Sequence, residues 1–334
     1  MTLVFRAVLL YLFAALATAG WVYDDFVRLT RDAMVTTAAM GRLMLGMGVF
    51  VLPAVLIGVI ALGGRHLLRR AAPLALVSIA AVLLPIGFSF LKNAIPNLVP
   101  YYADPALAAF DNWLHFGTDP WVWTHEVVPA SWGRALEIFY LNIWSVVAII
   151  FPIVVVATEH DDARMMRYIW LFFASWLVLG NLTALAGSSV GPVYYDRLLG
   201  TERFTDLTAA LAAAGIEQTG IGQVQAALWR RYEGGGLDLG LGISAFPSMH
   251  LAVATILACY LWERAKWLAP LGLAFVAIIF FVSLWSGYHY AIDGYASILA
   301  VIFANRALAR RFARQENERM LRNAAASQLL HSAR

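Results

Sequence analysis

Apolar segments of about 18 residues or more recur along the chain, and each can cross ~30 Å of hydrocarbon as a helix. Helices are expected because a segment in hydrocarbon must satisfy its own backbone hydrogen bonds. Only 13% of the 334 residues are charged, against about 25% in an average soluble domain, so the chain cannot cover itself with polar surface in water. We therefore predict an all-α integral membrane protein, a bundle of about eight transmembrane helices near residues 3–23, 42–63, 71–91, 135–157, 166–186, 245–262, 268–286 and 288–305.

Positive charge is unevenly distributed between the connections, which predicts the orientation of the bundle. The positive-inside rule assigns the basic connections and the basic tail to the cytoplasm. Both termini are then cytoplasmic, and the longer acidic segments 92–134 and 187–244 lie on the outer side. The basic residues concerned are Arg65, Arg69, Arg70, Arg164, Arg167, Arg264, Lys266, Arg306, Arg310, Arg311, Arg314, Arg319 and Arg322.

No internal repeat or linker divides the chain, so we expect one membrane domain over residues 1–334. Its catalytic core is expected at about 88–305, and residues 306–334 form the basic cytoplasmic tail. The first span permits two interpretations, because Arg6, an apolar run and Ala17-Thr18-Ala19 resemble a cleavable secretory signal. We favour an uncleaved span, and its removal would leave seven spans in the same orientation.

Residues 96–132 combine prolines with many aromatic side chains, a composition typical of the headgroup layer of a membrane. We predict one or two short interfacial helices here, on the outer face. Asp111 and His115 would share one face of such a helix. We interpret them as capping and packing residues rather than as catalytic groups.

Two polar motifs interrupt the apolar pattern at the outer ends of separate spans. The first is Ser-Ala-Phe-Pro-Ser-Met-His at residues 244–250, and the second is Ser-Gly-Tyr-His-Tyr-Ala-Ile-Asp at residues 286–293. Ionisable side chains near a membrane are costly and usually face a cavity or one another. His250, His289 and Asp293 are therefore the candidate catalytic residues. Taken singly, each could equally be a buried polar contact between helices.

These residue types suit displacement at phosphorus. His289 and Asp293 are four residues apart, so on a helix the carboxylate can fix the imidazole tautomer and leave the other nitrogen as a nucleophile. His250, on a different helix, can protonate a leaving group. Pro247 suits the first turn of a helix, whose free amides favour anions, and Ser248 adds a hydroxyl donor.

The pattern Pro-Ser-x-His at 247–250, followed by Gly-x-His-Tyr-x-x-Asp at 287–293, resembles the type 2 phosphatidic acid phosphatase superfamily. Within it the chain is most similar to the inositol phosphorylceramide synthase (inositolphosphotransferase) branch and its bacterial relatives, over about residues 88–300. The resemblance implies that His289 attacks phosphorus to form a phosphohistidine, that Asp293 supports it, and that His250 protonates the departing oxygen. His250 then activates water in a phosphatase or an alcohol in a transferase. No cofactor or metal is implied.

The chain departs from the family pattern at two arginines. The third motif usually begins with Ser-Arg six or seven residues before the nucleophile, but here Ser283 has no arginine beside it. The first motif usually reads Lys-x6-Arg-Pro, but here Lys92 is followed by Val99-Pro100. The missing arginines favour the synthase-like branch. The candidate phosphate-binding residues are Ser248, Lys92, Gly287, Arg197 and Tyr290.

Some of these candidates have simpler explanations. Lys92 can extend its ammonium group to the interface, Arg197 can pair with Asp196 or Glu202, and Tyr290 can be an interfacial aromatic residue. The glycine-rich residues 234–236 predict a loop near the site.

The predicted function is phosphoryl transfer on a lipid phosphoester, by a phosphatase or a phospholipid headgroup phosphotransferase. Its partners would be the lipid phosphate substrate, a lipid or polyol alcohol acceptor in the case of transfer, and membrane lipids, but no nucleic acid. We expect an inner or plasma membrane location. The site should be formed partly by segments 96–132 and 187–244 and should open laterally to the outer leaflet on the extracytoplasmic side. The alternatives are a metal-dependent hydrolase, because two histidines and a carboxylate can form a facial triad, and a non-catalytic lipid transporter or scaffold.

Overall fold

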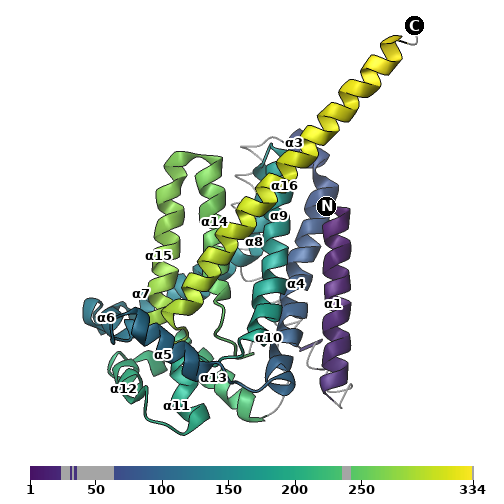
Figure 1. The fold of residues 1–334 in the computed structure, drawn as a ribbon. Coiled ribbons are helices and arrows are strands. Elements are labelled where there is room, and N and C mark those ends of the chain that lie inside the picture. The colour runs from purple at the N-terminus through teal and green to yellow at the C-terminus, as the bar shows by residue number, and fades with distance from the viewer. Residues whose placement is uncertain (24–30, 32–33, 36–63, 235–241, 333–334) are drawn as a thin grey trace.

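The computed structural model describes residues 1–23, 31, 34–35, 64–234 and 242–332. The regular secondary structure of these residues is all helical, with no strand (Figure 1). Six of its helical segments are long and apolar enough to cross a membrane: Thr2–Val22, Ala71–Leu98, Gly133–Thr158, Asp162–Ala186, Lys266–Trp285 and Ala291–Arg322. The prediction of an all-α integral membrane protein is confirmed, while the predicted span at 42–63 lies outside the described residues.

The helices of the bundle follow the apolar segments closely. They are α1 (Thr2–Val22), α3 (Gly64–Arg69), α4 (Ala71–Leu98), α7 (Gly133–Glu137), α8 (Trp144–Thr158), α9 (Asp162–Leu177), α10 (Ala184–Ala186), α14 (Met249–Arg264), α15 (Ala269–Trp285) and α16 (Ala291–Ser332). Two π-helical turns, Ile138–Ile143 and Val178–Thr183, join α7 to α8 and α9 to α10. The last predicted span therefore continues without a break into the basic tail, which projects beyond the bundle (Figure 1).

The helix predicted at 245–262 begins later, at Met249, and has 16 residues. Residues 242–248 are not helical because their backbone groups bond to neighbouring segments instead of to a helix of their own. The amide of Ala245 donates to the carbonyl of Ser189, and the amide of Ser248 donates to the carbonyl of Asp293. The first polar motif is thus an extended segment leading into α14.

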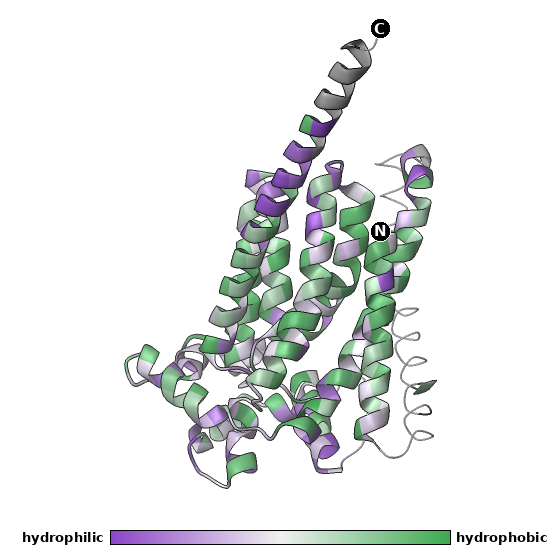
Figure 2. Ribbon diagram, turned by 45° about the vertical axis from the view of Figure 1, so that its right-hand side comes forward, coloured by the Kyte–Doolittle hydropathy of each residue, from purple (hydrophilic) through white to green (hydrophobic). Residues whose placement is uncertain are grey.

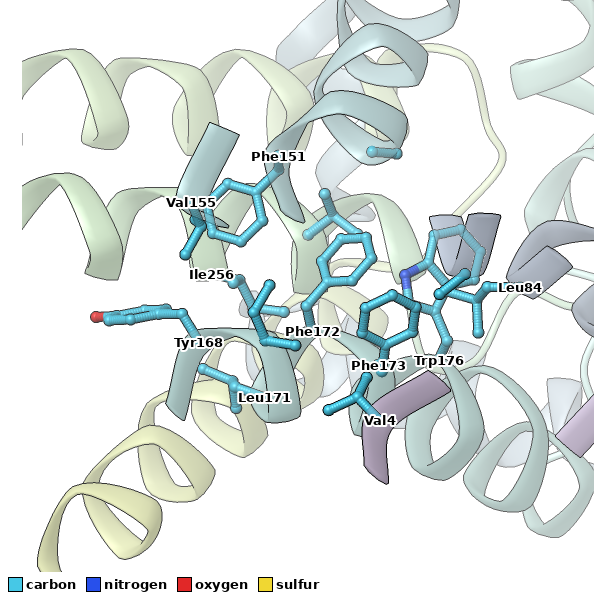
Figure 3. Packing of buried hydrophobic residues seen from close by; sticks show 14 of the residues in the cluster. Val4, Leu84, Phe151, Val155, Tyr168, Leu171, Phe172, Phe173, Trp176 and Ile256 are labelled. Atoms are coloured by element: carbon cyan, nitrogen blue, oxygen red, sulfur yellow. The ribbon is translucent and has the colours of Figure 1, made fainter. Parts of the chain in front are cut away.

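The main core lies between α1, α4, α8, α9 and α14 and is filled by apolar and aromatic side chains (Figure 3). It includes Val4, Leu84, Phe151, Val155, Tyr168, Leu171, Phe172, Phe173, Trp176 and Ile256. Large apolar side chains also cover the outer faces of the spans, for example Leu10, Phe13, Leu271 and Phe303, each more than 60% exposed. A bundle with apolar side chains both inside and outside requires lipid as its solvent, and Figure 2 shows the strongly polar residues gathered at its ends and along the tail.

Short helices gather at one end of the bundle (Figure 1). They are α5 (Asp104–Leu114), α6 (Pro120–Val127), α11 (Pro192–Leu199), α12 (Thr205–Ala213) and α13 (Gly220–Gly234). The starts of α14 and α16, which carry the two polar motifs, lie at this same end. The opposite end holds the basic connections, where Arg164 pairs with Glu159 at 2.8 Å and Arg70 with Asp162 at 3.3 Å.

Candidate active site

The two polar motifs, about forty residues apart in sequence, meet at the end of the bundle that carries the short helices. His289 lies between α15 and α16, Asp293 lies in the first turn of α16, and Ser248 and His250 lie at the start of α14. The amide of Ser248 donates to the carbonyl of Asp293 at 3.3 Å, which ties the two motifs together through their backbones. The structure thus brings together side chains that the sequence places on separate spans.

His289 is held between two partners. Its Nδ1 lies 3.1 Å from Oδ2 of Asp293, and its Nε2 lies 3.1 Å from Oγ of Ser248. Asp293 is fully buried, and the same carboxylate oxygen accepts the amide of Tyr290 at 3.1 Å. With Nδ1 protonated and donating to the carboxylate, Nε2 carries the lone pair and accepts from the serine hydroxyl. His289 is therefore held in the orientation that its predicted role as a nucleophile requires, and Ser248 covers its free nitrogen.

His250 is held by aromatic stacking instead of by hydrogen bonds. Its ring lies between those of Tyr140 and Trp144, with centroid distances of 4.2 Å and 3.9 Å. The indole of Trp144 also donates to the carbonyl of His250 at 3.0 Å. No residue in the described part of the chain hydrogen-bonds the His250 ring, so its nitrogens are open to a substrate. The ring centroid lies 6.4 Å from that of His289.

A cavity of about 330 Å³ adjoins the two imidazoles. Its lining includes His250, His289, Lys92, Tyr140 and Tyr288. Segment 187–244, predicted to lie on the outer side, contributes part of the wall through Val190, Tyr194, Val224 and Leu228. Among the described lining residues none comes from 96–132, the other segment expected to form the site.

The predicted phosphate-binding residues divide into two groups. Lys92 lines the cavity, and Ser248 contacts His289. Arg197, Gly287 and Tyr290 do not line the cavity. The Arg197 guanidinium lies 5.9 Å from the ring centre of Trp229, and the hydroxyl of Tyr290 donates to Asp104 at 3.0 Å.

Gly287 serves the shape of the second motif. Its φ is +70°, a conformation that favours glycine, and its carbonyl accepts the amide of Val193 at 2.9 Å. The glycine therefore turns the chain into the His289 segment.

Two buried carboxylates of α5 hold the His289 segment from outside the cavity. Asp104 accepts from Ser189 Oγ, the amides of Val190 and Gly191, and the hydroxyl of Tyr290, at 2.8–3.0 Å. This carboxylate is completely buried. It therefore joins the 188–191 loop to the residue that follows His289.

Asp111 caps α16, the helix that carries Asp293. Its two carboxylate oxygens accept the amides of Ala291 and Ile292 at 3.2 Å and 2.9 Å, which satisfies donors that a helix start leaves free. Burial raises the pKa of Asp111, although these two amides and nearby His115 favour its charged form. The interpretation of Asp111 as a capping residue agrees with this contact.

Sequence reasoning missed Asp104, Tyr140 and Trp144. The aromatic pair has the i, i+4 spacing of one helix face, but that spacing is common in apolar spans. Tyr140 lies within a π-helical turn and Trp144 directly follows it; such turns are frequent at functional sites, and the sequence did not reveal this one. In the described residues, no three His, Cys, Asp or Glu side chains are grouped so that they could hold one metal ion.

Comparison with known proteins identifies the family. A family model described as the PAP2 superfamily matches residues 105–307, which is more than half of the chain and includes both polar motifs. No curated protein and no solved structure matches the chain. The match includes α14, the first part of α16, and His250, His289 and Asp293. This membrane protein therefore belongs to the PAP2 superfamily of lipid phosphatases and phosphotransferases.

Proposed function

We propose that this protein transfers the phosphoryl group of a membrane lipid phosphoester through a phosphohistidine at His289. The observation that supports this most directly is the placement of His289. It is oriented by Asp293 and lies across one cavity from His250, with 6.4 Å between the two ring centroids. That separation accommodates a tetrahedral phosphorus with an attacking nitrogen on one side and a departing oxygen on the other.

In the first step the lone pair of His289 Nε2 forms a bond to phosphorus as the bond from phosphorus to the lipid oxygen breaks. Protonated His250 gives its proton to that oxygen, so the lipid leaves as an alcohol. The Asp293 carboxylate balances the positive charge that develops on His289. Ser248 must release Nε2 before the attack, and its hydroxyl is then free to donate to a phosphate oxygen.

In the second step His250, now neutral, takes a proton from water or from an alcohol. The oxygen of that molecule bonds to phosphorus, and the phosphorus–nitrogen bond breaks. A phosphomonoester and water give free phosphate, whereas a phosphodiester donor and an alcohol acceptor give a new phosphodiester. The two outcomes share the same residues and differ in which acceptor reaches the phosphohistidine.

The phosphate charge needs donors in place of the missing arginines. Lys92 lines the cavity and supplies a cation. The hydroxyl of Tyr140 is a second donor, because it is buried, lies on a ring stacked against His250, and has no hydrogen-bond partner in the described part of the chain. We assign both to the transition-state phosphoryl oxygens. A phosphate-binding site with one cation instead of several guanidinium groups supports assignment to the synthase-like, inositolphosphotransferase branch.

The charge distribution supports an extracytoplasmic site in an inner or plasma membrane. The cavity adjoins the end of the bundle with the short helices, and Arg70, Arg164 and Arg264 lie at the other end, which the positive-inside rule assigns to the cytoplasm. A fluorescent protein fused after residue 334 should fold and fluoresce, because the tail would be cytoplasmic. A fusion that is expressed at a normal level but does not fluoresce would contradict this orientation.

The test is incubation of the purified protein with labelled phosphatidate and labelled phosphodiester lipids, with and without diacylglycerol, ceramide and inositol-containing acceptors. We expect an acid-labile phosphoprotein, vanadate inhibition and full activity in excess EDTA. His289→Ala should abolish turnover, and His250→Ala should lower it by about 10²–10⁴-fold. His66→Ala is the matched control, because that ring contacts the Ala157 carbonyl at the far end of the bundle.

Two results would overturn the proposal. Turnover unchanged by His289→Ala would remove the nucleophile, and activity lost in EDTA would favour a metal-dependent hydrolase. Free phosphate as the sole product would identify a phosphatase. A new phosphodiester would identify a phosphotransferase, and its headgroup would test the inositol assignment.

A further inference from the structure

We propose that the inner part of the catalytic cavity is a slot for one hydrocarbon chain of the lipid substrate, and that Ala81 and Ala148 set the chain length that the enzyme prefers. This inference rests on the proposed function, since it concerns the lipid whose phosphate meets His289. It goes further by naming where a chain lies inside the bundle and which residues limit it.

The cavity continues along α4 well beyond the imidazoles. Lys92 lines it near the site, and Phe88, Pro85, Leu84 and Ala81 line it progressively farther along the helix. Lys92 and Ala81 are eleven positions apart, which corresponds to about 17 Å at the rise of an α-helix. The cavity is therefore much longer than a phosphate group requires.

The facing wall has the same form. Tyr140 lies beside His250, and Trp144, Ala148 and Ile149 continue the lining along α8. Ala148 is 8% exposed and Ala81 is 3% exposed, so the inner end lies inside the bundle and not on its lipid-facing surface. Both walls thus reach a buried alanine, where a larger side chain would shorten the slot.

A third wall keeps the slot open through a glycine. Gly180 lines the cavity from the π-helical turn that follows α9. A Cβ atom there would lie 2.6 Å from the Phe88 ring and 3.2 Å from the Met249 sulfur, both of which also line the cavity. Any side chain at this position would push these residues into the space.

The chemistry of the inner lining fits a hydrocarbon and not a polar group. No side chain that lines the cavity beyond Lys92 and the imidazoles is charged. The hydroxyl of Ser145 is already bonded to the Leu141 carbonyl. A polyol placed there would lose its hydrogen bonds to water without replacement. A hydrocarbon chain that enters from the bilayer moves from one apolar medium to another, so its transfer contributes little binding free energy. The slot therefore selects among chains by how closely they pack against its walls.

Trp176 provides a polar contact at the place where a chain joins its headgroup. It lines the cavity, is 6% exposed, and its indole N–H has no hydrogen-bond partner in the described part of the chain. Its ring centroid lies 6.4 Å from that of Trp144, which stacks on His250. A carbonyl that links a chain to the headgroup, an ester or an amide, is the acceptor that this donor fits.

The first test compares lipid phosphates with chains from dioctanoyl to dioleoyl on Ala81→Phe, Ala148→Phe and the wild type. We expect the ratio of kcat/KM for long over short chains to fall by roughly tenfold in each variant, with short-chain activity retained. Ala75→Phe is the matched control, because Ala75 is exposed on the same helix. An unchanged ratio in both variants, with the wild type active, would overturn the slot and leave the proposed function standing.

A binding measurement keeps the inference separate from catalysis. Native mass spectrometry of His289→Ala should detect bound long-chain phosphatidate, and adding Ala81→Phe or the milder Ala81→Leu should shift binding to shorter chains. Equal binding of all chain lengths by the single and double variants would refute the slot. A wild type that binds lipid selectively but turns over no lipid phosphoester would refute only the proposed function.

The second test concerns the linkage. Trp176→Phe should lower kcat/KM for ester- or amide-linked lipids by about fivefold, the loss expected for one hydrogen bond, and leave the matched ether-linked lipids unchanged. An equal effect on ester and ether lipids would show that Trp176 only packs. That result would remove the carbonyl contact from the proposal.

Discussion

Asp111 supports the proposed catalytic residues without lining the cavity, and Asp111→Asn isolates its effect. The carboxylate accepts the amides of Ala291 and Ile292, the first two residues of α16, and Asp293 follows in the same turn. An asparagine has the same shape but offers one acceptor oxygen, so its NH₂ group faces the second amide. The start of α16 would keep one of its two bonds, and the carboxylate that orients His289 would lose support.

The size of the effect follows from these contacts. A hydrogen bond to a charged group contributes about 1.5–3 kcal/mol, and a buried amide left without an acceptor costs about 1–3 kcal/mol. Part of this loss of stability is offset in Asp111→Asn. Burial raises the pKa of Asp111, and a neutral amide avoids the cost of desolvating a charge. We therefore expect Asp111→Asn to lower the free energy of unfolding by about 1–3 kcal/mol and Asp111→Ala by about 2–4 kcal/mol.

The assay pairs unfolding in mixed micelles with steady-state kinetics. Asp162→Asn is the control, because its side chain is 82% exposed and its pair with Arg70 should contribute at most about 1 kcal/mol. We expect kcat to fall in Asp111→Asn by more than the unfolded fraction explains, with KM nearly unchanged. If Asp111→Asn matched Asp162→Asn in both stability and kcat, the assignment of Asp111 as a positioning residue would be wrong.

Three further predictions concern other contacts of the site. Tyr140→Phe removes a buried hydroxyl that has no hydrogen-bond partner in the described structure, so it should raise thermal stability slightly. The same substitution should lower kcat/KM about tenfold. A fall in both thermal stability and kcat/KM would contradict the role of Tyr140 as a hydrogen-bond donor to phosphate. Burial lowers the pKa of His125, although its ring is hydrogen-bonded to a backbone carbonyl. The contribution of neutral His125 to stability is therefore complete above pH 6.5 and is lost as the pH falls below that value. His125→Gln should make the melting temperature less dependent on pH in this range. Gly191 has φ +82°, and a Cβ atom there would lie 2.3 Å from the Tyr288 carbonyl oxygen. Gly191→Ala should therefore lower the free energy of unfolding by at least about 2 kcal/mol. Gly64→Ala is the control and should be neutral in the same thermal melts, because a Cβ atom at Gly64 would meet open space.

Patterns that lipid enforces could be predicted from the sequence. Apolar length predicted most of the spans, because a helix in hydrocarbon has no other way to satisfy its backbone. The pairing of His289 with Asp293 was also predicted from a spacing of four residues, although they contact each other across the start of α16 and not within one regular helix. A local spacing remains informative here because the intervening chain is short.

Contacts between distant segments could not be predicted. Arg197 was a candidate substitute for the missing motif arginines, but its position beside Trp229 depends on how α11 packs on α13. Tyr140 and Trp144 have the appearance of ordinary apolar residues in the sequence, and only the packing of α8 and the preceding π-helical turn against α14 brings their rings onto His250. Asp104 is 85 residues from Ser189, a separation at which one sequence carries no signal of contact.

The two imidazoles that we propose as catalytic are positioned by different parts of the molecule. His250 is fixed by the bundle, through rings on the helix that packs against α14, whereas the segment carrying His289 is held by carboxylates of the short helix α5. The distance between the imidazoles therefore depends on how α5 sits against the start of α16. Because α5 has 11 residues and is too short to be stable alone, its position depends on these buried hydrogen bonds. A perturbation of α5 should thus change the geometry of phosphoryl transfer before it disturbs the bundle, and catalysis should fail at lower denaturant than the transmembrane helices do.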